Sequence, residues 1–318
     1  MIFKDHADEI LLALKNLSWY DILLLLGFGV FYQIMDAFIC RSLVNRLLPG
    51  FYLRQALDVT LLGVFGNVVT FAAGSIPMQT FYLHRCGLET GHGVGIMMLE
   101  YIMHKGSVVL FATILLLIEG GWLFASHADL SVYILVGYLI CLGIIVVLIS
   151  LCTWSKAYHL AIRFTDFVKR YDRWCSKAIR VQQQLNYLYE ESRSILKNTG
   201  VLLKVFLLNI LKLSVFCLVP YVCQHMIGIY GITPIQGLSM TSLMLLITSA
   251  IPNVAGMGPT EFAFLMLYVP LFADGPAASL LLLFRLATYY FPFLLSIAAF
   301  FKIQRQFQNL TPTPTTDK

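Results

Sequence analysis

Residues 130–152 read LSVYILVGYLICLGIIVVLISLC, 23 consecutive residues without a charged side chain. A helix that crosses the hydrocarbon core of a bilayer needs about 20 mainly apolar residues, so this stretch predicts a membrane-spanning helix. Seven other apolar stretches occur, near residues 19–40, 56–74, 93–118, 200–223, 235–251, 257–273 and 277–301. Two of these are short or interrupted by glycine and proline. The pattern predicts an all-α, polytopic membrane helix bundle with re-entrant or broken helices.

The composition supports a membrane protein over a soluble one. Of the 318 residues, 58% are hydrophobic and only 12% are charged, whereas a soluble domain carries about 25% charged residues. This excludes a disordered chain, a secreted disulfide scaffold and a sizeable soluble catalytic domain. The seven cysteines are scattered without a C-x-x-C pair, so we expect buried, reduced thiols. We predict no catalytic residue, no metal site and no cofactor.

One long polar insert, residues 153–199, divides the chain into two halves. We expect a short amphipathic segment at residues 1–18, a first transmembrane half at 19–152 and a second at 200–303. Residues 304–318, which end in a Thr/Pro tail, are expected to be disordered. The similarity of the halves at two motifs, described below, raises the possibility of an inverted repeat.

Lysine and arginine in the loops indicate the orientation. The insert holds nine Lys and Arg residues against four acids, the loop after the first stretch carries three arginines, and the loop at 224–234 has no charged residue. We therefore expect a multi-pass protein of the plasma (cell) membrane, with the insert, the first loop and the C-terminus in the cytoplasm. Two full crossings between Arg54 and Glu119 would contradict this orientation. A re-entrant hairpin at 56–92, broken near Gly74 and Pro77, removes the contradiction.

The insert also carries an apolar stripe at alternating spacings of three and four residues. Its members are Leu160, Phe164, Phe167, Tyr171, Trp174, Ala178, Val181, Leu185 and Leu188. One interpretation is a helix that lies on anionic lipid at the membrane surface. The alternative is a helical hairpin that packs on the cytoplasmic ends of the bundle. The stripe fits both.

Charged side chains inside apolar stretches are costly unless they face a cavity or a partner. The interrupting residues are Glu100, His104, Lys105, Lys204, Asn209, Lys212, Glu261 and Arg285. Cations outnumber acids among them, which suits an anionic group held between helices. Lys204 is expected to reach the cytoplasmic interface along its aliphatic stem. Glu261 and Arg285 fit either a structural ion pair or a role in transport.

Two Gly/Pro breaks resemble each other. Gly74-Ser-Ile-Pro77-Met-Gln79 and Gly256-Met-Gly258-Pro259-Thr-Glu261 both read G-x-x-P-x-(Gln/Glu), one in each half. Such paired interruptions indicate the binding site of a transporter. Where a helix restarts, its free amide N–H groups can bind a phosphate.

The same residues resemble a family. The run from Gly66 to Gln79 is similar to the F-F-N-x-I-T-P-x-A-x-G-G-Q-P-x-Q signature of the lysylphosphatidylglycerol synthase transmembrane-region family. The run from Ile251 to Glu261 is similar to its P-x-P-G-G-x-G-x-x-E element, and Arg285 falls where the family has W-R-x-x-x-Y. The resemblance covers most of residues 56–301. The chain departs from the signatures at Phe71, Ser75, Ile76, Asn253 and Ala255.

The resemblance implies translocation of an anionic or aminoacylated phospholipid, or a lipid-linked headgroup, between leaflets. In the multiple peptide resistance factors this region is the flippase-like half, and a separate soluble domain transfers the lysyl group from aminoacyl-tRNA. We expect a stand-alone form, because the 47-residue insert and the 17 residues after Phe301 are too short for such a domain. The rival hypotheses are a membrane-embedded phosphatidylglycerol lysyltransferase and a non-transporting scaffold for a cytoplasmic lipid synthase.

In the flippase hypothesis the two breaks face each other across a cavity. Helix-start amides and Arg285 hold the lipid phosphate, and polar side chains from both breaks bind the rest of the headgroup. The expected partners are this lipid and the membrane lipids at the basic insert, without nucleic acid. The expected lipid-binding residues are Asn67, Gly74, Pro77, Gln79, Glu100, Lys105, Pro252, Gly256, Gly258, Glu261, Arg285 and Tyr289.

Overall fold

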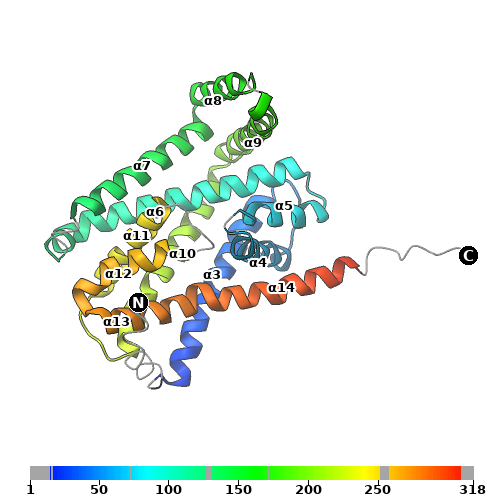
Figure 1. Ribbon diagram of the computed structural model, residues 1–318. Coiled ribbons are helices and arrows are strands. Elements are labelled where there is room, and N and C mark those ends of the chain that lie inside the picture. The colour runs from blue at the N-terminus through cyan, green and yellow to red at the C-terminus, as the bar shows by residue number, and fades with distance from the viewer. Residues whose placement is uncertain are drawn as a thin grey trace, which may run out of the picture.

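The computed structural model describes residues 15, 17–71, 73–126, 131–170, 172–250 and 258–308. All regular structure in these ranges is helical (Figure 1), which confirms the all-α prediction. The longer elements are α3 (Trp19–Val44), α6 (Thr90–Ser126), α7 (Ser131–Thr153), α9 (Asp172–Leu196), α10 (Thr199–Met226) and α14 (Phe291–Gln308). The shorter ones are α4 (Leu53–Val69), α5 (Ser75–Arg85), α8 (Ser155–Val168), α11 (Pro234–Ala250), α12 (Pro259–Phe272), α13 (Asp274–Arg285) and the π-helical turn η2 (Leu286–Tyr290).

Five helical segments in the described part of the chain are long and apolar enough to cross a membrane. They are Trp19–Val44, Thr90–Ser126, Leu135–Thr153, Thr199–Met226 and the continuous run Asp274–Gln306. The other three apolar stretches form α4, α11 and α12, with 17, 17 and 14 residues. At 1.5 Å per residue, 14 residues extend only about 21 Å. The chain is therefore a polytopic helical membrane protein in which α12 is shorter than a full span, while α4 and α11 lie at the lower limit of spanning length.

The first half contains a helical hairpin between two long helices. Helices α4 and α5 pack along each other, and the hydroxyl of Tyr82, near the end of α5, donates to Asp58 Oδ2 near the start of α4 at 3.2 Å. The hairpin therefore opens toward the end of the bundle where α3 stops and α6 begins. Its tip is the break between Val69 and Ser75.

The second half repeats the order of long helix, hairpin and long helix, with α10, α11, α12 and the α13–α14 run. The hydroxyls of Thr241 on α11 and Tyr268 on α12 lie 3.0 Å apart. Helices α3 and α10 run antiparallel, since Tyr32 contacts Phe216 while Asp36 contacts Lys212. The two hairpins consequently open toward opposite ends of the bundle.

A pair of glycines allows the sharp break in the first hairpin. A Cβ atom on Gly66 would lie 2.8 Å from the carbonyl carbon of Gly74, and one on Gly74 would lie 2.8 Å from the carbonyl oxygen of Gly66. These are backbone atoms, which cannot turn aside as a flexible side chain can. Helix α4 and the start of α5 thus approach closely because both positions lack a side chain.

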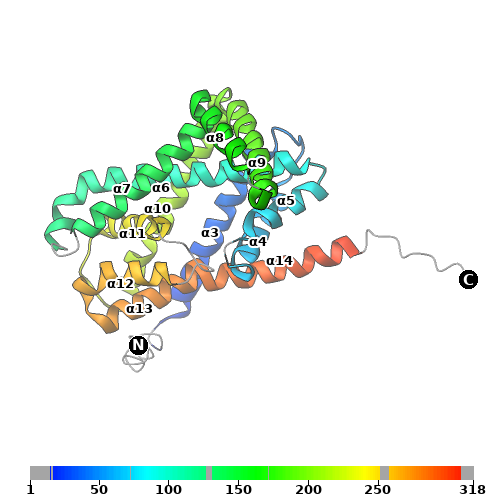
Figure 2. The same ribbon diagram turned by 45° about the horizontal axis from the view of Figure 1, so that its top comes forward.

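The insert forms two helices, as the hairpin interpretation requires, and not one continuous helix. The chain turns at Lys169 and Arg170, between α8 and α9. Helix α9 packs against α6 (Figure 2). His92 Nδ1 on α6 lies 2.6 Å from Glu191 Oε1 on α9, and Leu188 of α9 is buried. This matches the hairpin interpretation.

Helix α8 keeps the other half of the stripe on its surface. Leu160, Phe164 and Phe167 are exposed at spacings of four and three residues. Contact between this face and lipid stays a prediction.

Some expectations concern residues outside the described ranges. Pro252 and Gly256 of the second break lie there, as do most of residues 1–18 and the tail from residue 309. Helix α14 continues to Gln308, five residues beyond the expected boundary at 303. Basic and polar residues at positions 302–308 therefore extend a spanning helix.

We predict that Gly66→Ala destabilises the protein by about 1–3 kcal/mol, because the added methyl group meets backbone of the partner segment. The matched control is Gly27→Ala on α3, where a Cβ would meet no atom within 4 Å. Thermal unfolding of the purified variants in detergent measures the difference. Equal midpoints for both variants would contradict the close approach of α4 and α5.

Candidate functional site

A polar cavity of about 310 Å³ lies between α3, α4, α5, α6 and α10. Its lining is unusual for the interior of a membrane bundle, because it includes two carboxylates, a lysine, a histidine and two amides. The lining residues are Tyr32, Asp36, Asn67, Ala73, Ser75, Ile76, Gln79, Met97, Glu100, Tyr101, His104 and Lys212. Three of the helices that are long and apolar enough to cross a membrane, α3, α6 and α10, contribute to it. The cavity can hold a small polar or zwitterionic group between apolar helices.

Asp36 on α3 and Lys212 on α10 form an ion pair at one wall. Lys212 Nζ lies 2.5 Å from Asp36 Oδ1, and the lysine side chain is only 3% exposed. The ammonium also lies 4.9 Å from the centroid of the Tyr32 ring, which faces it as a cation–π partner. A buried lysine without these contacts would carry a large desolvation cost. Asp36 therefore compensates the charge of the buried lysine inside the bundle.

Glu100 and His104 occupy successive turns of α6 and face the same cavity. His104 Nδ1 lies 3.3 Å from Asn209 Oδ1 on α10. Glu100 Oε2 is buried and has no hydrogen-bond partner among the described residues. A buried carboxylate oxygen without a donor is costly. This atom is therefore available to a cation or a donor that enters the cavity.

The first helix break supplies the opposite wall. Helix α5 begins at Ser75 after the N-cap Gly74, and Ser75, Ile76 and Gln79 line the cavity with its first turn. The amide N–H groups of a first helical turn and the positive end of the helix dipole favour an anion. Pro77, in the same turn, is exposed and has no N–H to offer. The break thus places the N-terminus of a helix in the lining of the polar cavity.

The described part of the second break forms a separate cluster. Glu261 Oε2 accepts a hydrogen bond from the N–H of Gly258 at 2.6 Å, and its Oε1 accepts from Arg285 Nε at 2.7 Å. Arg285 is 7% exposed and lies 5.1 Å from the centroid of the Tyr289 ring. The glutamate therefore caps α12 and joins it to the end of α13. The ion pair between neighbouring helices is therefore present, and a role of these residues in transport stays a prediction.

The backbone supports this cluster at two unusual places. Gly258 has φ +89°, which favours glycine, and Pro259 occupies the first position of α12. Arg285 directly precedes η2, and π-helical turns are frequent at functional sites. None of Gly258, Glu261, Arg285 and Tyr289 lines the polar cavity.

Lys105 on α6 faces α11 and does not line the polar cavity. Its Nζ donates to Ser249 Oγ on α11 at 2.7 Å and lies 5.6 Å from the Tyr101 ring. Of the residues predicted to bind lipid, the structure brings together Asn67, Gln79 and Glu100 in the cavity, next to the break at Gly74. Lys105 is separated from them.

Asp36, Tyr32 and Lys212 were not among the predicted lipid-binding residues. Lys212 was recognised as a charge within an apolar stretch, and the same criterion applied to the stretch at 19–40 finds Asp36. Another such pair joins the C-terminal helix to α4, where Lys302 Nζ lies 2.8 Å from Asp58 Oδ1. Tyr32 carried no comparable signal, because aromatic residues are common in apolar helices.

Comparison with known families gives one match. The family model described as "Lysylphosphatidylglycerol synthase TM region" matches residues 6–296. No curated protein matches the chain. The matched region contains the polar cavity, both helix breaks and the whole insert.

We predict that Asp36→Asn destabilises the protein by roughly 3 kcal/mol, because it leaves the Lys212 ammonium buried without a counter-ion. The double variant Asp36→Leu with Lys212→Met is expected to recover most of that loss, since it removes both charges. Lys204→Met, an exposed lysine on the same helix, is the control and should change stability by less than about 0.5 kcal/mol. Thermal unfolding in detergent provides the measurement. A double variant as unstable as Asp36→Asn would contradict the pairing.

Proposed function

The chain belongs to the lysylphosphatidylglycerol synthase TM-region family, and from this membership we propose that it is a lipid flippase or scramblase. Its substrate is an anionic or aminoacylated phospholipid, or a lipid-linked headgroup of the same chemistry. Membership in the family supports a function in membrane lipid chemistry. The translocation step and the substrate are our proposal.

The observation that carries the proposal is the polar cavity among membrane-spanning helices. Intramembrane charges are rare and mark substrate or ion pathways when they face a cavity. Here a lysine, a histidine, two carboxylates and a helix N-terminus line one space of about 310 Å³. A headgroup that crosses a bilayer needs such a set of partners, because it exchanges its hydration for them.

The two hairpins support the same function. Interrupted helices in corresponding positions of two halves are typical of transporters, whose substrate lies near the repeat interface. We propose that both hairpins are re-entrant and that the first break lies at membrane depth, where protein and the cavity cover its backbone. The loop before α4, the insert and the C-terminal end of α14 then share the cytoplasmic side of the cell membrane.

Each part of the headgroup has a proposed partner. The phosphate binds the first turn of α5 and the Lys212 ammonium, with Asn67 and Gln79 as neutral hydrogen-bond partners. The ammonium of an aminoacyl group binds the unpaired oxygen of Glu100. A second binding site for the phosphate is the cluster of Glu261, Arg285 and Tyr289. There the phosphate competes with Glu261 for the arginine.

We predict that Glu100→Gln slows translocation of lysylphosphatidylglycerol by more than about tenfold, because it removes a buried charge partner of the ammonium. Translocation of phosphatidylglycerol, which has no ammonium, should change little. The measurement uses purified protein in liposomes with fluorescent forms of both lipids and follows loss of the protected inner-leaflet signal. Lys204→Met is again the control.

The outcomes separate the rival functions. Equal rates for wild type and protein-free liposomes with both lipids would contradict translocation. Formation of lysylated lipid by the chain alone from charged tRNA would support the transferase instead. An effect of Glu100→Gln on both lipids alike would show that Glu100 does not select the ammonium.

A further inference from the structure

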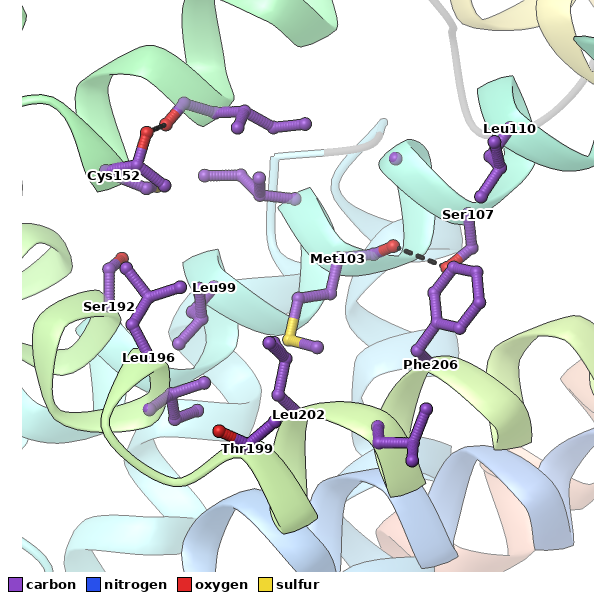
Figure 3. A pocket seen from close by; sticks show the side chains of 16 residues that line it. Leu99, Met103, Ser107, Leu110, Cys152, Ser192, Leu196, Thr199, Leu202 and Phe206 are labelled. Atoms are coloured by element: carbon purple, nitrogen blue, oxygen red, sulfur yellow. Dashed lines mark hydrogen bonds between the residues drawn. The ribbon is translucent and has the colours of Figure 1, made fainter.

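A second cavity, larger than the polar one, lies between α6, α7, α9 and α10 (Figure 3). Its volume is about 580 Å³, within the range of sites that bind small molecules. Sixteen residues line it: Leu99, Ile102, Met103, Gly106, Ser107, Leu110, Ile149, Cys152, Thr153, Ser192, Ile195, Leu196, Thr199, Leu202, Leu203 and Phe206. None of them carries a charge, and half are leucine or isoleucine.

The hydroxyl groups in this lining are mostly occupied by their own helices. Ser107 Oγ donates to the carbonyl of Met103 at 2.9 Å, as Figure 3 shows, and Thr153 Oγ1 donates to that of Ile149 at 2.8 Å. Ser192 does the same with Leu188 at 2.6 Å. These donors are therefore not offered to a ligand. The cavity suits a ligand that has no polar atoms to satisfy.

The cavity also opens where spanning helices face outward. Its lining residues Leu203 on α10 and Leu110 on α6 are 56% and 44% exposed. Both lie within segments long and apolar enough to cross a membrane. An apolar opening at this position faces lipid rather than water, so a hydrocarbon chain can enter it directly from the bilayer.

The lining is elongated along the helices. On α6 it runs from Leu99 to Leu110, about 16 Å at 1.5 Å per residue. On α9 it includes Ser192 and Leu196, and the next residue in each case is an exposed cation, Arg193 and Lys197. An extended chain can therefore lie along α6, beside basic residues of the insert.

Helix α6 separates this apolar cavity from the polar one. Leu99 and Met103 face the first, while Glu100 and His104 face the second. On α10 the apolar lining ends at Phe206, one turn before Asn209, which contacts His104. The contact of His104 with Asn209 thus lies at the seam of α6 and α10, between hydrocarbon-lined and charge-lined space.

We propose that the apolar cavity binds an acyl chain of a phospholipid, held between α6 and α10 and closed on one side by the insert helix α9. The proposal rests on the proposed function for the kind of lipid. It deepens that function, because it assigns the substrate's chain to a site different from its headgroup site. It also gives the insert a role, as a wall of the chain site.

The test is photocrosslinking with phosphatidylglycerol that carries a diazirine in its acyl chain. The full-length protein is reconstituted with this probe, irradiated and digested, and adducts are located by mass spectrometry. We expect adducts on residues 99–110 and 199–206. Gly106→Leu should reduce them roughly tenfold by filling the cavity, since a Cβ at this position would meet only Ile149 Cδ1, at 3.7 Å.

The matched control is Gly121→Leu, the same substitution on the same helix. A Cβ there would meet no atom within 4 Å, and Gly121 does not line the cavity. Adducts on Leu117 and Ile118, which are exposed on α6, report general contact with the bilayer and serve as the reference. Cavity adducts that are no more frequent than this reference, or that persist in Gly106→Leu, would overturn the proposal.

This readout is independent of transport. If the liposome assay shows no translocation while Gly106→Leu still removes the cavity adducts, the chain site stands and the proposed function fails. If translocation depends on Glu100 but the adducts do not depend on Gly106, the function stands and the chain site fails.

Discussion

The ion pair of Asp36 and Lys212 is the constraint around which the bundle is organised. A lysine that is 3% exposed within a spanning helix needs a counter-ion at contact distance. Its partner lies on the first helix of the other half, so α3 and α10 must pack together in one register. The contact of Tyr32 with Phe216, one turn away, shows that they run antiparallel. That packing places the two hairpins, which follow α3 and α10 in the chain, on opposite ends of the bundle. The polar cavity then forms where the ion pair, the first break and α6 meet.

Much of the fold follows from local signals in the sequence. Uninterrupted apolar stretches predict spanning helices, because the bilayer sets their length. Gly74 and the prolines of the two breaks predict where the helices stop. The family signature depends on the same residues, which is why fold and family could be inferred together. The position of the turn between α8 and α9 could not be located, because the spacing of apolar residues continues through Lys169 and Arg170.

The site was predictable only in part, since its geometry comes from pairings between distant segments. Asn67, Gln79 and Glu100 share a cavity because α4, α5 and α6 follow one another and pack closely. Whether Lys105, one residue after His104, faces the same space depends on the helix that lies beside it. That neighbour is α11, where Ser249 accepts a hydrogen bond from Lys105. Glu261 and Arg285 are 24 residues apart, and both of the roles considered for them agree with the sequence.

The two cavities on opposite faces of α6 suggest how one helix can serve a molecule that is polar at one end and apolar at the other. A phospholipid cannot place its whole surface in either cavity. One is lined by charges that hydrocarbon would leave unsatisfied, and the other offers no charge to a headgroup. In the proposed function, movement of the headgroup between leaflets requires the chain to remain in apolar surroundings while the phosphate passes charged groups. The two surroundings meet where α6 and α10 contact each other. There His104 contacts Asn209, and the apolar lining residues Met103 and Phe206 lie within one turn of them. A lipid that spans this boundary has polar protein groups around its headgroup and apolar groups around its chain. This lowers the free energy needed to move the headgroup out of water and the chain out of the bilayer.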